Sequence, residues 1–283
     1  MNDEEFIIKR VDNVIHELRP DLTRSMASKL IKMGKVTINT KIVTKPSQKV
    51  KINDKIIVDY DENEYDPNLE IDIPVIYEDD EVVVINKPLG LLSHAKGNFN
   101  KEPTVETWVK SRIKNIEGPR AGIVHRLDRA TSGVMILAKT LNAQKKLSKQ
   151  FANRKVKKTY IAIVDGHLKE NEALIDLPIE RNPKKPQTFR VGINGKSAQT
   201  NYKVLKHNDK YTLVELKPTT GRTHQLRVHL NYLLHPIAGD IIYEGSKQDR
   251  MYLHALSLEL TLPNSERRTF EAKLPSEFNK LVK

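Results

Sequence analysis

Apolar residues recur at helical spacing in two short segments near the start of the chain. The first stripe stops before Pro20 and the second stops at Gly34, as expected where helices end. The stripes consist of Val11, Val14, Ile15 and Leu18, and of Met26, Leu30 and Met33. Residues 36–39 and 56–58 then alternate as short strands do. The pattern therefore predicts a small α+β unit over residues 1–60.

A different pattern begins near residue 75, where continuous apolar runs typical of buried strands appear. These runs lie at 82–85, 134–138, 159–164 and 212–216. Helical stripes are expected within 104–115, with Val105, Val109 and Ile113 inward, and around Ala143, Leu147 and Phe151. Strands and helices mix without strict alternation, which predicts an α+β fold with a mixed sheet over residues 75–283.

The two units are separated by a strongly acidic stretch. No Lys or Arg occurs from Ile56 to Asn86, where eleven residues are Asp or Glu. Pro67 and Pro74 lie within this stretch, and its like charges repel and extend the chain. We therefore expect residues 61–74 to form a linker between two basic units.

The charge outside the linker favours a polyanionic partner. The 283 residues include 48 Lys and Arg against 36 Asp and Glu, a formal net charge of +12 at pH 7. Because the linker is acidic, the basic excess lies on the two units, where it would attract nucleic acid by counterion release. A basic protein without such a partner is the alternative that charge alone leaves open.

Several classes of protein are excluded by what the sequence lacks. It has no cysteine, which excludes disulfides, cysteine-ligated metals and a thiol nucleophile. No apolar run could span a membrane, and the acidic start does not look like a secretory signal, so we expect a cytoplasmic protein. We also expect it to be a monomer. A glycine-rich phosphate loop is absent and the histidines lack metal-pair spacing, which argues against a nucleotide cofactor and a metal site.

The segment 125–133 carries the most concentrated candidate chemistry. Its sequence, His-Arg-Leu-Asp-Arg-Ala-Thr-Ser-Gly, places Asp128 between Arg126 and Arg129, directly before the strand expected at 134–138. A carboxylate delivered to the edge of a core can be held rigid and partly dry, as acid–base or nucleophilic catalysis requires. An exposed Asp–Arg pair of little energetic value is the other interpretation.

A second polar segment, 219–229, supplies candidate partners, because an unpaired buried carboxylate is costly. Its charged or titratable residues are Arg222, His224, Arg227 and His229. The alternative is that Arg227 and His229 form the solvated face of a helix whose apolar positions are Leu226 and Leu230.

The segment 125–133 resembles the signature of the RluA family of pseudouridine synthases, in which the acid is catalytic. Other segments similar to family motifs lie at 86–94, 219–229, 235–240 and 251–255. The resemblance covers about residues 75–275 and implies a pseudouridine synthase fold with a mixed, mainly antiparallel sheet. Because isomerisation gains no atom and changes no oxidation state, we expect neither a metal nor an organic cofactor.

The resemblance implies roles for seven residues at the target uridine. The catalytic carboxylate is Asp128, paired with Arg227, while Tyr160 stacks on the target base and assists proton transfer. The substrate-binding residues are Arg126, which fills the gap left by a flipped base, Leu253, an apolar wall of the uracil pocket, Arg222, a second candidate partner of Asp128, and His94, expected to contact RNA.

The first unit resembles an S4 RNA-binding domain. The residues that carry this resemblance are Arg10, Asp12, Leu22, Arg24, Ser25, Leu30, Ile31, Gly34, Val36, Asn39, Pro46 and Asp54. It implies RNA binding through basic residues on or near the second helix, namely Arg24, Lys29, Lys32 and Lys35. A merely solvated basic face is the alternative.

These observations predict an enzyme of the family's RluD-like subgroup that isomerises uridines in structured ribosomal or transfer RNA to pseudouridine. Asp128 could act as nucleophile or as base, and the sequence does not choose between them. A second interpretation is a non-catalytic RNA-binding or ribosome-assembly protein on the same scaffold, which would predict a broken Asp128 motif. A third is a hydrolase that uses Asp128 with His224 or His229.

Overall fold

The computed structural model describes residues 9–51, 53–60, 71–94, 102–113, 116 and 120–283. These residues form two compact units, a smaller one that includes residues 9–60 and a larger one that includes residues 71–94 and 103–283. Of the linker expected at 61–74, residues 61–70 lie outside the described residues.

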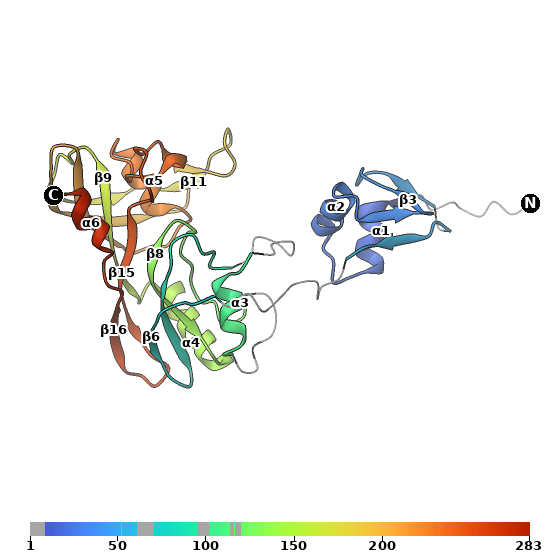
Figure 1. The fold of residues 1–283 in the computed structure, drawn as a ribbon, viewed down its shortest axis with the longest axis horizontal. Coiled ribbons are helices and arrows are strands. Elements are labelled where there is room, and N and C mark those ends of the chain that lie inside the picture. Colours follow the sequence, from blue (N-terminus) through green and yellow to red (C-terminus); the bar gives the residue numbers. More distant parts are fainter. Residues whose placement is uncertain (1–8, 52, 61–70, 95–101, 114–115, 117–119) are drawn as a thin grey trace, which may run out of the picture. The chain divides into compact units, whose positions relative to one another are not determined.

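Two helices packed on short strands build the smaller unit (Figure 1). The helices are α1 (Val11–Leu18) and α2 (Arg24–Lys32), and the strands are β1 (Lys9–Arg10), β2 (Val36–Ile38), β3 (Lys41–Ile42), β4 (Lys49–Val50) and β5 (Ile56–Val58). Strand β2 pairs antiparallel with β3 and β5, and β1 pairs with β4. The Thr23 side chain caps α2 by accepting from the Met26 amide, and Gly34, with φ 73°, follows the end of this helix.

The core of the smaller unit follows the predicted stripes except at the helix ends. Val11, Ile15 and Leu30 are buried, as predicted. The prediction was wrong for Leu18 and Met33, which are 65% and 62% exposed. Both stand at the C-terminal end of a helix, where so small a unit has too few residues to cover the last turn.

A nine-stranded sheet organises the larger unit (Figure 1). The strand order is β10-β13-β14-β9-β15-β8-β7-β6, and β16 pairs with the second half of β15. These strands are β6 (Val75–Glu78), β7 (Val82–Lys87), β8 (Ser132–Ala138), β9 (Lys157–Asp165), β10 (Glu172–Asp176), β13 (Gln199–His207), β14 (Tyr211–Pro218), β15 (Leu253–Thr261) and β16 (Arg267–Glu271). A separate hairpin pairs β11 (Ile179–Arg181) with β12 (Phe189–Val191).

Helices cover the two halves of this sheet separately. They are α3 (Val105–Lys110), α4 (Leu141–Ala152), α5 (Gln225–Tyr232) and α6 (Ser276–Leu281), with a short 3-10 turn, η1 (Ile241–Tyr243). Helices α3 and α4 join a core with β7, β8 and β16, whereas α5 and α6 join a second core with β9 and β14. In Figure 1, α3 and α4 lie beside β6 and β8, and α5 lies near β11 in the other half. Tyr160 packs against both cores and so marks their boundary.

The predicted fold class is confirmed. Neighbouring strands of the described sheet pair antiparallel, except that β15 and β8 pair in parallel, so the sheet is mixed and mainly antiparallel. The four strands predicted in this unit are present and longer than predicted. The helix predicted at 104–115 is shorter, because a tight turn from the Arg112 amide to the Val109 carbonyl ends it, and residues 114–115 lie outside the described residues. Within the described chain, no helix is both long and apolar enough to cross a membrane.

Candidate active site

A pocket opens in the larger unit where the two cores meet. It is lined by the loop before β8, by β9, by the turn after β14, by α5 and by the start of β15. Six of the seven residues predicted at the target uridine line it, namely Arg126, Asp128, Tyr160, Arg222, Arg227 and Leu253. The fold therefore brings together residues from four separate segments of the chain, at 126–131, 158–160, 218–227 and 253.

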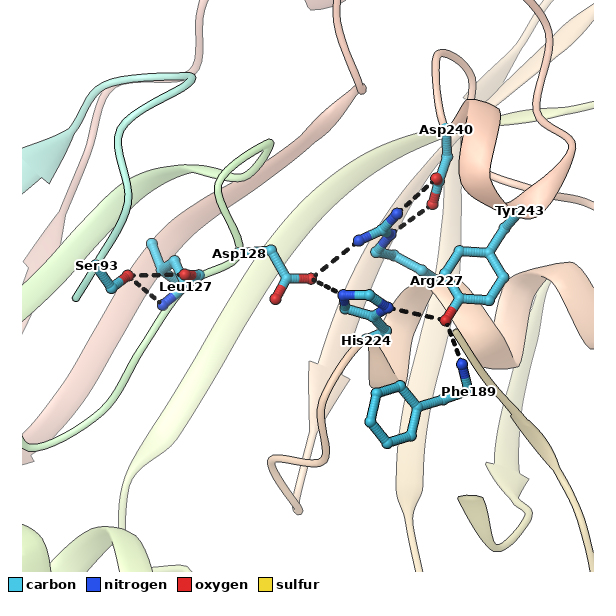
Figure 2. Close-up of polar contacts among 8 residues, drawn as sticks. All are labelled: Ser93, Leu127, Asp128, Phe189, His224, Arg227, Asp240 and Tyr243. Atoms are coloured by element: carbon cyan, nitrogen blue, oxygen red, sulfur yellow. Dashed lines mark hydrogen bonds and ion pairs between the residues drawn. The ribbon is translucent and has the colours of Figure 1, made fainter. Parts of the chain in front are cut away.

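The loop that carries Asp128 is braced by the segment after β7. Ser93 Oγ accepts from the Leu127 amide at 3.1 Å and donates to the Leu127 carbonyl at 2.7 Å (Figure 2). The Gly90 amide donates to the Arg129 carbonyl at 2.9 Å, and Arg129 Nε donates to the Gly90 carbonyl at 2.9 Å. Both neighbours of Asp128 are therefore tied to the same adjacent segment, which fixes the backbone at the carboxylate.

Lys87, the last residue of β7, anchors this bracing segment from inside. Its side chain is fully buried, and Nζ donates to the carbonyls of Pro88 at 2.9 Å and Leu91 at 2.8 Å. Burial lowers the pKa of Lys87 to about 8, although the charge of Asp128 acts in the opposite direction. The sequence did not predict this role, because a lysine at a strand end is usually exposed.

Gly133 lets strand β15 approach the loop that carries Asp128. Its φ is 117°, and a Cβ at this position would lie 2.2 Å from the carbonyl oxygen of Ala255. The adjacent Ser132 Oγ lies 2.9 Å from Nδ1 of the buried His254. The glycine that ends the motif is therefore required by the close contact of β8 with β15.

Asp128 lies in the pocket with two nitrogen groups near one of its oxygens. Arg227 Nη1 is 3.3 Å from Oδ2 of Asp128, and His224 Nε2 is 3.8 Å from the same oxygen (Figure 2). The Asp128 side chain is 19% exposed and that of Arg227 is 5% exposed. The interpretation of Asp128 as half of an exposed surface pair is therefore wrong.

Arg227 is held by a second carboxylate that the sequence did not predict. Its Nε donates to Oδ2 of Asp240 at 2.6 Å, and its Nη2 donates to Oδ1 at 2.7 Å (Figure 2). Burial would lower the pKa of Arg227, but the hydrogen bonds to Asp240 and the charges of Asp240 and Asp128 outweigh burial and raise it. Arg227 therefore stays charged and fixed, with Nη1 directed at Asp128.

Helix α5 does not present a solvated polar face, so that alternative interpretation is wrong. Arg227 and His229 are both buried. His229 Nδ1 lies 3.0 Å from Thr200 Oγ1, and its Nε2 lies 3.0 Å from the Leu177 carbonyl oxygen. His229 is thus part of the internal hydrogen bonding.

Among the described residues, no group of three or more His, Cys, Asp or Glu side chains is arranged to hold a metal ion.

Strand β9 contributes Lys158 and Tyr160 to the pocket. Lys158 Nζ donates to the Thr220 carbonyl at 2.7 Å, and burial lowers the pKa of Lys158 to about 8. Burial, and then the charge of Asp128, raises the pKa of Tyr160, so its hydroxyl stays protonated at neutral pH. Tyr160 therefore offers the pocket an aromatic ring and a neutral hydroxyl.

The other predicted substrate-binding residues differ in exposure and in hydrogen-bond partners. Arg126 is exposed at the pocket, and its Nη1 lies 3.2 Å from Nε2 of the buried His94. Arg222 lines the pocket, but its Nε donates to the Ser197 carbonyl at 3.0 Å. The observed ion pair of Asp128 is formed by the first candidate, Arg227, and not by Arg222.

The four basic residues predicted to bind RNA in the smaller unit differ in their surroundings. Lys29 and Lys32 of α2 are exposed. Arg24 Nε lies 3.2 Å from Oδ2 of the buried Asp12, and Lys35 forms a 2.6 Å ion pair with an aspartate just after β5. Arg24 is exposed as well, but it also balances a buried carboxylate.

Family models match both units. The model for RNA pseudouridylate synthase matches residues 81–232, a range that contains Asp128, Tyr160 and Arg227. The model for the S4 domain matches residues 9–56, which contain both helices of the smaller unit.

Individual proteins are similar over most of the chain. An "uncharacterized RNA pseudouridine synthase" of Aquifex aeolicus (strain VF5) is 40% identical, over 88% of this chain and 81% of that protein. Ribosomal large subunit pseudouridine synthase D of Vibrio parahaemolyticus serotype O3:K6 is 36% identical, over 95% of this chain and 88% of that protein. The same enzyme of Escherichia coli (strain K12) is 34% identical, over 97% and 90%.

A solved structure of a protein named as an RNA pseudouridylate synthase has a similar fold. Human RNA pseudouridylate synthase domain containing 4 superposes with a TM-score of 0.59 at 30% identity, covering 73% of this chain and 90% of that chain. The fold, the two family matches and the near-full-length relatives lead to the same conclusion. The chain belongs to the RNA pseudouridylate synthase family, carries an S4 domain, and is an enzyme that isomerises uridines in RNA.

Proposed function

We propose that this enzyme modifies uridines in the RNA of the large ribosomal subunit. Relatives named ribosomal large subunit pseudouridine synthase D match nearly the whole chain, which supports this substrate over transfer RNA. We also propose that it acts in the cytoplasm as a monomer. It would need neither a metal nor a nucleotide cofactor, because isomerisation changes no oxidation state. The family assignment leaves the non-catalytic and hydrolase interpretations without support.

The choice of RNA is tested by offering the purified enzyme several transcripts. Large-subunit ribosomal RNA, small-subunit ribosomal RNA and transfer RNA are incubated separately, and pseudouridine is mapped at single-nucleotide resolution. We expect new pseudouridine in the large-subunit transcript and little in the other two. Preferential modification of transfer RNA would contradict the proposed substrate while leaving the isomerase activity intact.

We infer that Asp128 is the catalytic carboxylate, and the observation that carries this inference is its ion pair with Arg227, which Asp240 fixes in turn. The reaction breaks the N1–C1′ bond and forms a C5–C1′ bond, while C5 loses a proton and N1 gains one. A carboxylate beside the ribose can attack C1′ or remove a ribose proton. Both routes use the carboxylate of Asp128, which Arg227 Nη1 contacts at 3.3 Å.

We assign the remaining pocket residues to binding of the flipped uridine. Tyr160 and Leu253 come from the paired strands β9 and β15 and would form an aromatic and an apolar wall for the base. Arg126, exposed and in contact with His94, is placed to enter the gap that the base leaves in the RNA. In this assignment the buried His94 acts through Arg126, and Arg222 contributes positive charge to the pocket lining.

We propose a three-part organisation, with an S4 RNA-binding domain at 1–60, an acidic linker at 61–74 and a catalytic domain at 75–283. The S4-domain match at residues 9–56 supports the first part. Arg24 and Lys35 are engaged in ion pairs within the unit, so we assign the main phosphate contacts to Lys29 and Lys32. Contacts of this kind position the RNA without reading its sequence.

Neutralising Lys29 and Lys32 together, as Lys29→Gln and Lys32→Gln, should weaken RNA binding and flatten its salt dependence. Each lost phosphate contact lowers the slope of log affinity against log salt by about 0.7 on single strands and about 0.9 on duplex. The measurement is RNA binding across a salt series.

The matched control neutralises Lys45 and Lys49, two exposed lysines of the same unit that lie outside α2. It removes the same total charge, so a smaller change in slope is expected if α2 itself contacts phosphates. Equal slopes for the two double variants would show that the contribution of α2 is no more than general charge.

A further inference from the structure

His224 directly precedes α5, with φ 57° and ψ 19° in the left-handed region of backbone space. Residues other than glycine are uncommon in this region, and His is among the types enriched there together with Asn and Asp. The turn before α5 therefore sets the position from which the imidazole of His224 reaches the pocket that it lines.

The ring is oriented by a chain of hydrogen bonds that begins at the β11–β12 hairpin. The Phe189 amide donates to Tyr243 Oη at 2.9 Å, and Tyr243 Oη lies 2.9 Å from His224 Nδ1 (Figure 2). The Phe189 and Tyr243 rings also meet the imidazole edge to face, each at a centroid distance of 5.6 Å. The imidazole is thus clamped on both sides in one orientation.

These hydrogen bonds also bear on the tautomer of His224. Burial raises the pKa of Tyr243, so its hydroxyl keeps its proton at neutral pH. Tyr243 Oη accepts from the Phe189 amide, and its proton can be donated to His224 Nδ1, which lies 2.9 Å away. In that arrangement Nδ1 accepts, and a neutral ring carries its own proton on Nε2, the nitrogen that faces Asp128.

The two nitrogen groups near Asp128 reach the same carboxylate oxygen. Arg227 Nη1 lies 3.3 Å and His224 Nε2 lies 3.8 Å from Oδ2, so both contacts are made to Oδ2 rather than Oδ1 (Figure 2). A distance of 3.8 Å is longer than a hydrogen bond, but contacts of catalytic groups commonly tighten when substrate closes the site. Arg227 and His224 together therefore define which oxygen is restrained.

We propose that His224 is a positioning residue for the isomerisation, whose Nε2 proton holds Oδ2 of Asp128 and so presents Oδ1 to the ribose. Tyr243 acts one step further away, by fixing the tautomer of His224. The proposal rests on the proposed catalytic role of Asp128. It identifies Oδ1 as the reacting oxygen whether Asp128 acts as nucleophile or as base.

Two substitutions of His224 separate this role from a purely structural one. The side-chain amide of glutamine can place a nitrogen near the position of His224 Nε2, whereas that of asparagine can place it only near Nδ1. Backbone strain ranks the two in the opposite order, because Asn tolerates the left-handed region better than Gln does. The proposal therefore predicts that His224→Gln is the more active variant and His224→Asn the more stable one.

The measurements are kcat and KM on the target RNA, with thermal unfolding of each variant. We expect kcat of His224→Gln to exceed that of His224→Asn at least about tenfold, or about 1.4 kcal/mol of transition-state stabilisation, with similar KM values. Tyr243→Phe should also lower kcat without raising KM, and combining it with His224→Gln should cause little further loss. Exposed His207, changed to Gln, is the matched control and should behave as wild type.

A kcat for His224→Asn equal to or above that of His224→Gln would overturn the proposal. Wild-type kcat in both variants is one such result, and activities that rank in the order of thermal stability are another. The Asp128→Asn variant, measured in parallel, separates such a result from failure of the underlying function. If Asp128→Asn is inactive and His224→Asn is at least as active as His224→Gln, only the role of His224 is contradicted.

Discussion

Asp128→Asn should reduce the rate of pseudouridine formation by at least about 1000-fold, equivalent to about 4 kcal/mol of transition-state stabilisation. The amide keeps the shape of the side chain and can still accept from Arg227, so the pocket should stay folded. It lacks the charge and basicity that either proposed role of the carboxylate needs. The rate is measured in single-turnover reactions on the target RNA.

RNA affinity shows whether the lost rate reflects a slower reaction or weaker binding. We expect the dissociation constant of Asp128→Asn for the target RNA to match that of the wild type, because the proposed RNA contacts are made by basic residues. Asp209→Asn, at an exposed turn, removes the same charge far along the chain from the motif and should leave the rate unchanged. If Asp128→Asn retained a tenth of the wild-type rate, Asp128 would not be the catalytic residue.

Asp240→Asn should be the next most damaging change, although Asp240 does not contact Asp128 in the observed network. It would leave the buried Arg227 with one of its two carboxylate partners. Removing one member of a buried ion pair typically costs about 3 kcal/mol or more. We expect a loss of stability of this size in the larger unit, and a fall in kcat because Arg227 is no longer held toward Asp128.

The chain has a single tryptophan, Trp108 in α3, so its fluorescence during denaturant unfolding reports on the larger unit. The kinetic part is measured below the unfolding midpoint of the variant, which keeps lost activity separate from lost folding. Asp209→Asn again serves as the charge-matched control. A variant with wild-type stability and wild-type kcat would show that Asp240 is dispensable for holding Arg227.

The strands of the larger unit could be predicted because their signal is local. The runs around 82–85 and 134–138 are apolar throughout, and the structure buries both of the corresponding strands. The Asp128 motif was recognisable for the same reason, since it is contiguous. The pair Asp128–Arg227 was predicted through the family resemblance, because nothing in local spacing relates two residues 99 positions apart.

Residues that support the site from irregular segments could not be predicted. Asp240 and Tyr243 lie in or beside the short turn η1. No helical or strand repeat of apolar residues in this segment indicates which way a side chain points. The segment 235–240 was noted as similar to a family stretch, but its partner could be identified only from the fold. Lys87 shows the same limit, because a strand pattern gives no sign that its last residue is a buried cation.

The pairing of β8 with β15 has a consequence for how the protein is made. It joins Gly133 to Ala255, so the loop of Asp128 reaches its final packing only when a strand near the end of the chain has been synthesised. Contacts this distant in sequence form slowly and late in folding. The S4 unit, whose hydrophobic core is drawn from residues 11–60, can fold on this core as soon as it leaves the ribosome. During synthesis the nascent chain therefore acquires its RNA-binding unit well before it acquires a complete catalytic pocket.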